Sequence, residues 1–230
     1  MFFPFFDPTF IILIPAIIIS IYAQGKVQST FNRYLRVPSA TGFTGADVAR
    51  RLLRSSGIHD VEVEMIGQRL GDHYDPRNKK LRLSPEVYKS TSLAAIGVAA
   101  HETGHAIQHD RGYFPLEVRS TLVPVTSIGS SLSFPLLFLG LIMGAPALVK
   151  IGVLAFTLVV LFQLVTLPVE FNASSRAIAV LQKEGLIAGQ EVGAVRKVLT
   201  AAALTYVAAA ITAVLNLVRL LVLARLFGDE

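Results

Sequence analysis

The amino-acid sequence predicts a mainly α-helical integral membrane protein, with about four transmembrane helices and a small α+β region on the cytoplasmic side. Of the 230 residues, 53% are hydrophobic and the mean hydropathy is +0.58, which is more apolar than an ordinary soluble domain. Four long stretches carry no charged residue, and polar segments containing Lys and Arg separate most of them. These observations define the fold class.

Each uncharged stretch is near or above the length of about 20 apolar residues that a membrane-spanning helix needs. The first could instead be a secretory signal peptide, but its start, MFFPFFDP, lacks the basic residues that such a peptide carries. The fourth could be a buried alanine-rich helix, but a chain of this length offers little protein around it. The predicted spans are therefore residues 8–25, 120–149, 151–169 and 198–218.

Charge sets the expected topology, because Lys and Arg next to spans mark the cytoplasmic side. The polar regions 26–90 and 170–197 both carry such residues, which predicts that both are cytoplasmic and that the turn near Gly144 is external. Arg219 and Arg225 would then lie at the outer end of the last span, where long side chains can reach the interface.

The chain is therefore expected to contain five regions in sequence. They are an N-terminal transmembrane anchor (1–25), a cytoplasmic region (26–119), a transmembrane helical hairpin (120–169), a cytoplasmic helix (170–197) and a C-terminal transmembrane helix (198–230).

Composition excludes several classes of protein. There is no cysteine, so disulfides and thiolate metal ligands are excluded. The net charge of +5 is modest and follows from the membrane topology, so no nucleic-acid partner is expected.

The first polar region has a pattern of helix, strand, turn, strand and helix. Thr44 is a plausible N-cap and Gly57 a C-terminal stop, and Ser84 precedes a proline at a helix start. The expected elements are a helix over 44–57, a strand over 61–66, a turn over 72–80, an alternating run at 81–84, a short helix from Pro85 and a helix over 93–110.

The last of these helices contains AAHETGHAIQH, residues 99–109. His101 and His105 lie four apart and therefore on one face, where two imidazoles can bind the same ion. Glu102 is turned by about 100 degrees from His101, so it can reach a water on that ion without binding the ion itself. This is the mechanical basis of the H-E-x-x-H zinc motif, in which the Glu acts as general base in hydrolysis.

The alternative is a pair of surface histidines that bind nothing. The apolar turn before the motif, AAIGVAA, argues against it, because that turn places the polar cluster at the buried end of a helix. Unpartnered imidazoles and a carboxylate would be costly there.

A catalytic zinc needs a third protein ligand, and three residues are candidates. His109 lies a further turn along the helix, about 5.4 Å on, and Asp110 points off the face. Glu170 follows the third uncharged stretch, where a carboxylate could also be merely interfacial. Two spans separate the motif from Glu170, so both return to the same side of the membrane, and this favours Glu170.

Three segments, DHYDPRNKKLRLS, SLAAIGVAAHETGHAIQH and LPVEFNASSRAI, resemble the YugP family of membrane zinc metallopeptidases. The resemblance covers nearly the whole chain in order. The family is described as neutral zinc peptidases, gluzincin relatives of the HtpX-like membrane proteases. The resemblance implies a multi-pass protein of the bacterial inner membrane with a Zn²⁺ ion held by His101, His105 and Glu170.

HtpX-like relatives carry the third ligand in an E-x-x-A-D motif. This chain has Glu170 and Ala173, but Ser174 replaces the Asp that commonly supports a zinc histidine. By the same analogy, Leu81, Arg82 and Leu83 would form an edge strand to which an extended substrate adds.

Other residues give weaker signals. His73, Tyr74 and Arg77 are conceivable donors to an oxyanion, although their segment is also typical of a turn. Arg176 could do the same or pair with a carboxylate.

The expected function is that of a membrane-bound zinc endopeptidase with Glu102 as general base, acting on protein or peptide substrates at the cytoplasmic face. Such a peptidase could form a homo-oligomer or bind a membrane protein partner. The alternative is a non-proteolytic scaffold or adaptor that keeps the fold, and the intact Glu102 argues against it.

Overall fold

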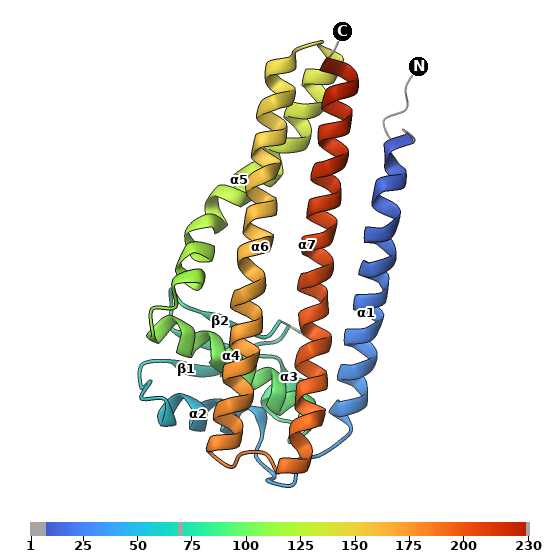
Figure 1. Cartoon of the computed structure of the whole chain (residues 1–230). Coiled ribbons are helices and arrows are strands. Elements are labelled where there is room, and N and C mark those ends of the chain that lie inside the picture. The colour runs from blue at the N-terminus through green and yellow to red at the C-terminus, as the bar shows by residue number, and fades with distance from the viewer. Residues whose placement is uncertain (1–7, 69–70, 229–230) are drawn as a thin grey trace. The chain divides into compact units, whose positions relative to one another are not determined.

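The computed structural model describes residues 8–68 and 71–228 (Figure 1). Residues 1–7 of the predicted anchor, 69–70 of the first polar region and 229–230 of the predicted last helix lie outside this description. The elements in order are η1 (Pro8–Leu13), α1 (Ile14–Leu35), α2 (Gly45–Ser55), β1 (Glu62–Met65), β2 (His73–Asp75), β3 (Lys80–Leu83), α3 (Pro85–Tyr88), α4 (Leu93–Asp110), α5 (Phe114–Ile142), α6 (Pro146–Lys183), η2 (Gly189–Glu191) and α7 (Val192–Gly228).

The chain is mainly helical, as predicted, and four helical segments of the described chain are long and apolar enough to cross a membrane. They are Pro8–Leu35, Phe114–Ile142, Pro146–Lys183 and Gly189–Leu226. They contain the four predicted spans, apart from the residues that form the turn between α5 and α6. That turn occupies residues 143–145, with Gly144 at φ +58°.

Residues 8–23, 118–167 and 205–228 form one compact unit, here called the four-helix unit. Its core is apolar and includes Leu137, Phe156 and Leu220. Small residues bring backbones together, since a Cβ on Gly129 would lie 3.0 Å from the Ala155 carbonyl oxygen. Many large apolar side chains of these helices are exposed, as expected for surfaces that face lipid.

Polar side chains of the four-helix unit also pair with one another. Ser20 and Thr212 are joined by a hydrogen bond of 3.2 Å between their hydroxyl oxygens. Arg219 donates to the Thr9 hydroxyl and lies over the Phe10 ring, 5.8 Å from its centroid.

Residues 24–117 and 168–204 form the second compact unit, here called the α+β unit. The predicted cap Thr44 is confirmed, since its hydroxyl accepts from the Asp47 amide. Ser84 is at the start of α3, as predicted, but its side chain makes no capping hydrogen bond. At the start of α4 the Ser92 hydroxyl accepts from the Ala95 amide. Gly57 ends α2 at φ +81°, a backbone conformation that favours glycine. One buried cluster packs α2, the sheet and α4 around Leu53, Leu81 and Ala99.

The sheet corrects two predictions. Its strand order is β1-β3-β2, with β3 parallel to β1 and antiparallel to β2. The predicted edge strand, Leu81 to Leu83, is therefore wrong, because β3 is the central strand and pairs on both sides. His73–Asp75, which the sequence suggested was part of a turn, instead forms strand β2 at the edge of this sheet.

Two predicted helix boundaries are also wrong. We expected separate helices over 170–197 and 198–230. Instead α6 runs without a break through Glu170 to Lys183, and α7 runs without a break from Val192 (Figure 1). Glu170 does not end α6, because its buried carboxylate is paired with His101 and His105.

Candidate metal centre

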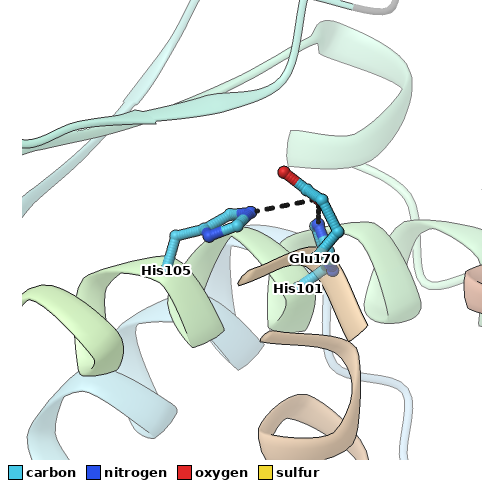
Figure 2. Close-up of side chains that lie close together, drawn as sticks. All are labelled: His101, His105 and Glu170. Carbon is cyan, nitrogen blue, oxygen red and sulfur yellow. Dashed lines mark hydrogen bonds and ion pairs between the residues drawn. The ribbon is translucent and has the colours of Figure 1, made fainter. Parts of the chain in front are cut away.

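Helix α4 places the two motif histidines one turn apart on the same face, and α6 brings a carboxylate between them (Figure 2). The Glu170 Oε2 atom lies 3.1 Å from Nε2 of His101 and 3.5 Å from Nε2 of His105. One ligand atom from each of the three residues lies within 4.8 Å of the others. The three are here called the donor set.

The donor set is shielded from solvent. The Glu170 side chain is 2% exposed, and those of His101 and His105 are 13% and 11% exposed. The two imidazole rings meet edge to face with centroids 4.7 Å apart. A cation in this position would be held by two buried groups, His105 and Glu170, and by the half-buried His101, with little competition from water for them.

Each histidine is held through its other ring nitrogen. The Nδ1 atom of His101 lies 3.1 Å from the Ser174 hydroxyl, and that of His105 lies 3.0 Å from the amide oxygen of Gln108. The amide nitrogen of Gln108 donates to the Val169 carbonyl, which fixes the direction of the amide. His105 must therefore donate from Nδ1, and in its neutral form Nε2 carries a lone pair toward the centre of the donor set.

Lone pairs of imidazole facing a buried carboxylate repel it unless a cation lies between them. A proton on the imidazole would also remove this repulsion. Burial lowers the pKa of His105, but the hydrogen bond to Glu170 and the charges of Glu102 and Glu170 raise it more, so the net shift is upward. A divalent ion removes this conflict without a proton, and two imidazoles with one carboxylate are a ligand set that suits zinc.

A second layer of contacts fixes α6 against α4. The Asn172 side-chain oxygen accepts from Gln108 at 3.0 Å and from Arg176 at 2.6 Å. Gly104 packs against the backbone of Ala173, and a Cβ on Gly104 would lie 2.6 Å from the Ala173 carbonyl oxygen. The absence of a side chain at Gly104 therefore permits the close approach that brings Glu170 to the histidines.

Glu102 faces the sheet. Its Oε2 atom accepts a hydrogen bond of 3.1 Å from the backbone amide of Tyr74 on β2. Burial raises the pKa of Glu102, charge on His101 and His105 opposes this, and the charge of Glu170 adds to it, with a net rise. A carboxylate with a raised pKa accepts a proton more readily, which is the property that a general base needs.

The other predicted ligand candidates have different partners. The Nδ1 atom of His109 lies 2.9 Å from the Tyr74 hydroxyl, and Asp110 forms an exposed ion pair with Arg111 at 3.5 Å. Among the described residues, only His101, His105 and Glu170 form a group that could hold a metal ion.

The predicted oxyanion donors are spread over the α+β unit. His73 is exposed on β2, and Arg77 is exposed in the turn after it. Burial raises the pKa of Tyr74 to about 12, so its hydroxyl remains a donor at neutral pH. Arg176 donates to Asn172 and lies over the Tyr113 ring, 5.6 Å from its centroid. Their role in binding an oxyanion stays a prediction.

Sequence reasoning missed Gln108. The residue is fully buried, and it connects His105 on α4 to Val169 and Asn172 on α6. Its spacing of three from His105 places it on the same helix face, which is the signal that could have found it. Ser174, at the position of the aspartate in the HtpX-like motif, was noted in the sequence, and it is the residue that contacts His101.

Membrane-length helices and a set of two imidazoles and one carboxylate that could hold a metal ion are the features expected of a membrane metallopeptidase. The comparisons agree with this class. The family model described as "Putative neutral zinc metallopeptidase" matches residues 9–225, and the chain belongs to that family. The chain is 47% identical over 218 residues to "Putative membrane protease YugP" from Bacillus subtilis (strain 168), covering 94% of this chain and 96% of that protein. No solved structure matches the chain.

Proposed function

We propose that this protein is a membrane-bound zinc endopeptidase whose ligands are His101, His105 and Glu170 and whose general base is Glu102. The observation that carries the proposal is the donor set itself, in which two imidazoles and a carboxylate converge from two helices while Nδ1 of each imidazole is held by a neutral side chain. The zinc ion, when bound, polarises a water molecule and a peptide carbonyl for hydrolysis.

The protein's own residues would perform the remaining steps. Glu102 takes the proton from the attacking water and then delivers it to the amine that leaves, so the C–N bond breaks and one water is consumed. Ser174 and Gln108 hold the two imidazoles with Nε2 facing inward.

Strand β2 is the element best placed to bind substrate. It is a terminal strand of the described sheet, and its Tyr74 amide points to Glu102 rather than to β3. An extended peptide that adds as a strand along this edge would pass beside the proposed general base. Protein or peptide chains in extended conformation are therefore the proposed substrates.

We propose the same membrane arrangement that the charge pattern predicts. Residues 26–119 and 170–197 would lie at the cytoplasmic face, as the catalytic region and the segment that supplies the third ligand. The anchor within 1–25, the hairpin 120–169 and the last helix 198–230 would cross the bilayer. Support comes from the uncharged stretches, which fall within four membrane-length helices except for the turn at residues 143–145.

Replacement of Glu102 tests the proposal. Glu102→Gln should reduce cleavage of an unfolded model protein by at least about 100-fold, because an amide cannot accept the proton. Zinc should remain bound, because Glu102 is not a proposed ligand. Cleavage would be measured with the purified chain in detergent, with and without a chelator, and bound zinc by elemental analysis.

Glu62→Gln is the matched control, since Glu62 is 71% exposed on β1 and should leave both readings unchanged. Full activity of the Glu102 variant, or loss of its zinc, would remove Glu102 from the proposed role. Absence of zinc-dependent cleavage in the wild-type chain would favour the scaffold alternative.

A further inference from the structure

Tyr74 joins strand β2 to helix α4 through both its backbone and its side chain. Its backbone amide donates to Oε2 of Glu102 at 3.1 Å, and its hydroxyl oxygen lies 2.9 Å from Nδ1 of His109. The rings of Tyr74 and His109 are tilted, with centroids 5.8 Å apart. Glu102 and His109 are separated by about 10 Å of helix rise, so one residue of β2 contacts two turns of α4. His105 lies between them on the same stripe of the helix.

The backbone of Tyr74 faces the free edge of the described sheet. Strand β2 has three residues and is the terminal strand of that sheet, antiparallel to β3, with Tyr74 opposite Leu81. In an antiparallel ladder the N–H and C=O of one residue point to the same side, and successive residues alternate. Since the Tyr74 N–H points to Glu102, those of His73 and Asp75 point to β3. Tyr74 is therefore the residue of β2 that offers a backbone donor to an added strand.

This donor already has a partner in the free chain. An extended peptide that adds to β2 places a carbonyl oxygen where it can accept from the Tyr74 N–H. Oε2 of Glu102 occupies that N–H instead. One N–H makes one well-aligned hydrogen bond, so Glu102 and the peptide compete for it. The same contact keeps the Glu102 carboxylate directed at the strand.

We propose that Glu102 and the main chain of an extended peptide use the Tyr74 N–H in turn, so that binding of a substrate releases the carboxylate from β2. This rests on the proposed function, in which Glu102 is the general base. In the free chain Tyr74 is a positioning residue that holds Glu102 on the strand. When a peptide carbonyl takes the N–H, the Glu102 side chain can turn toward the attacking water. The Tyr74 hydroxyl keeps its contact with His109, so the strand stays beside α4.

Two substitutions of Glu102 separate the competing bond from the chemistry. Neither Gln nor Ala can serve as the base, so Glu102→Gln and Glu102→Ala both leave a bound peptide intact. The Gln amide oxygen can still accept from Tyr74, whereas Ala cannot. The probe is a short fluorescein-labelled peptide of alternating valine and threonine, and its binding to each full-length variant in detergent would be measured by fluorescence anisotropy. Glu102→Ala should bind it about 3- to 10-fold more tightly, the effect of losing one competing hydrogen bond.

The same peptide with every amide N-methylated is the control ligand, because it cannot pair as a strand, and it should bind both variants equally. Tyr74→Phe in each variant is the control in the protein, because it keeps the N–H and removes only the hydroxyl, and the ratio of affinities should persist. Equal affinities of the two Glu102 variants for the unmodified peptide would overturn the proposal. So would loss of the ratio with Phe at position 74, the same ratio for the N-methylated peptide, or a peptide that binds neither variant.

Hydrogen exchange at the Tyr74 amide gives a second reading. The chain has six tyrosines, so isotope-labelled tyrosine gives few amide signals, and Tyr74→Phe identifies the signal that it removes. Exchange should be slow in Glu102→Gln, faster in Glu102→Ala and slow in both once the peptide is bound. Equal exchange rates in the two free variants would overturn the proposal. Neither reading uses cleavage, and zinc-dependent cleavage by the wild-type chain is expected even if only this exchange of partners fails, so the two failures are distinguishable.

Discussion

An alanine at Gly104 would test how α4 and α6 hold the donor set. The added Cβ would lie 2.6 Å from the Ala173 carbonyl oxygen, and ordinary van der Waals contact begins near 3.4 Å. The two helices must therefore separate by about 0.8 Å at this point, because the nearest atoms are the backbone atoms of Ala173, which cannot rotate away as a side chain could. Glu170 lies three residues from Ala173, and His105 is the next residue after Gly104, so the separation acts on the donor set directly.

Gly104→Ala should lower the free energy of unfolding by about 1–3 kcal/mol, the usual effect of overpacking. Cleavage should fall by up to about 100-fold, since a displacement of about 1 Å at a site has effects of that size. Zinc retained after a mild chelator wash should fall as well, measured by elemental analysis beside a cleavage assay.

Gly97→Ala is the control on the same helix, because the nearest atoms to its added Cβ belong to side chains and lie at ordinary contact distance, Val195 at 3.4 Å and Val198 at 3.9 Å. The reasoning is refuted if the Gly104 variant keeps wild-type zinc and cleavage. It is also refuted if Gly97→Ala produces an equal loss, since the effect would then come from alanine in α4 rather than from the contact with Ala173.

Three further predictions follow from the site and the charge pattern. Glu170→Ala should release zinc in a chelator wash, whereas His109→Ala should retain it; the opposite pattern would overturn the assignment of the third ligand. Ser174→Ala should weaken zinc affinity about 10- to 100-fold, as for other partners of metal-binding histidines. Ser175→Ala should leave it unchanged, because the Ser175 hydroxyl donates to the Phe171 carbonyl. Equal zinc affinities of the two variants would exclude a role for the contact between Ser174 and His101. A cysteine at Gly144 should react with an impermeant thiol reagent on intact cells and one in α2 should not, and the reverse labelling would invert the proposed topology.

Much of the fold was predictable because its signals are local. Long uncharged stretches indicate membrane-length helices, and capping residues such as Thr44 and Ser92 mark helix starts through their own hydrogen bonds. The histidine pair follows from helix geometry alone. The choice of Glu170 came from counting spans, and the structure places its carboxylate beside both imidazoles.

The errors occurred where contacts between segments, rather than the local pattern of one segment, decide the structure. His73–Asp75 reads as a turn because Asp, Pro and Asn surround it, yet pairing with β3 makes it a strand. Because β3 pairs with β1 on one side and with β2 on the other, it is the central strand, and no local pattern shows which strand lies at an edge. Gln108 was missed because its partners Val169 and Asn172 lie some 60 residues further along the chain.

The position of Glu170 along the chain also bears on when the protein can become active. The two histidines precede α5, and the third member of the donor set follows the apolar part of α6, so the chain must pass the bilayer twice, on the proposed topology, before the set is complete. Ser174 and Asn172, which fix the helices around it, arrive in the same late segment. A nascent or wrongly inserted chain would therefore carry a histidine pair without its carboxylate. On the proposed function, a chain that has not inserted into the membrane would therefore lack a complete metal site and would have no peptidase activity.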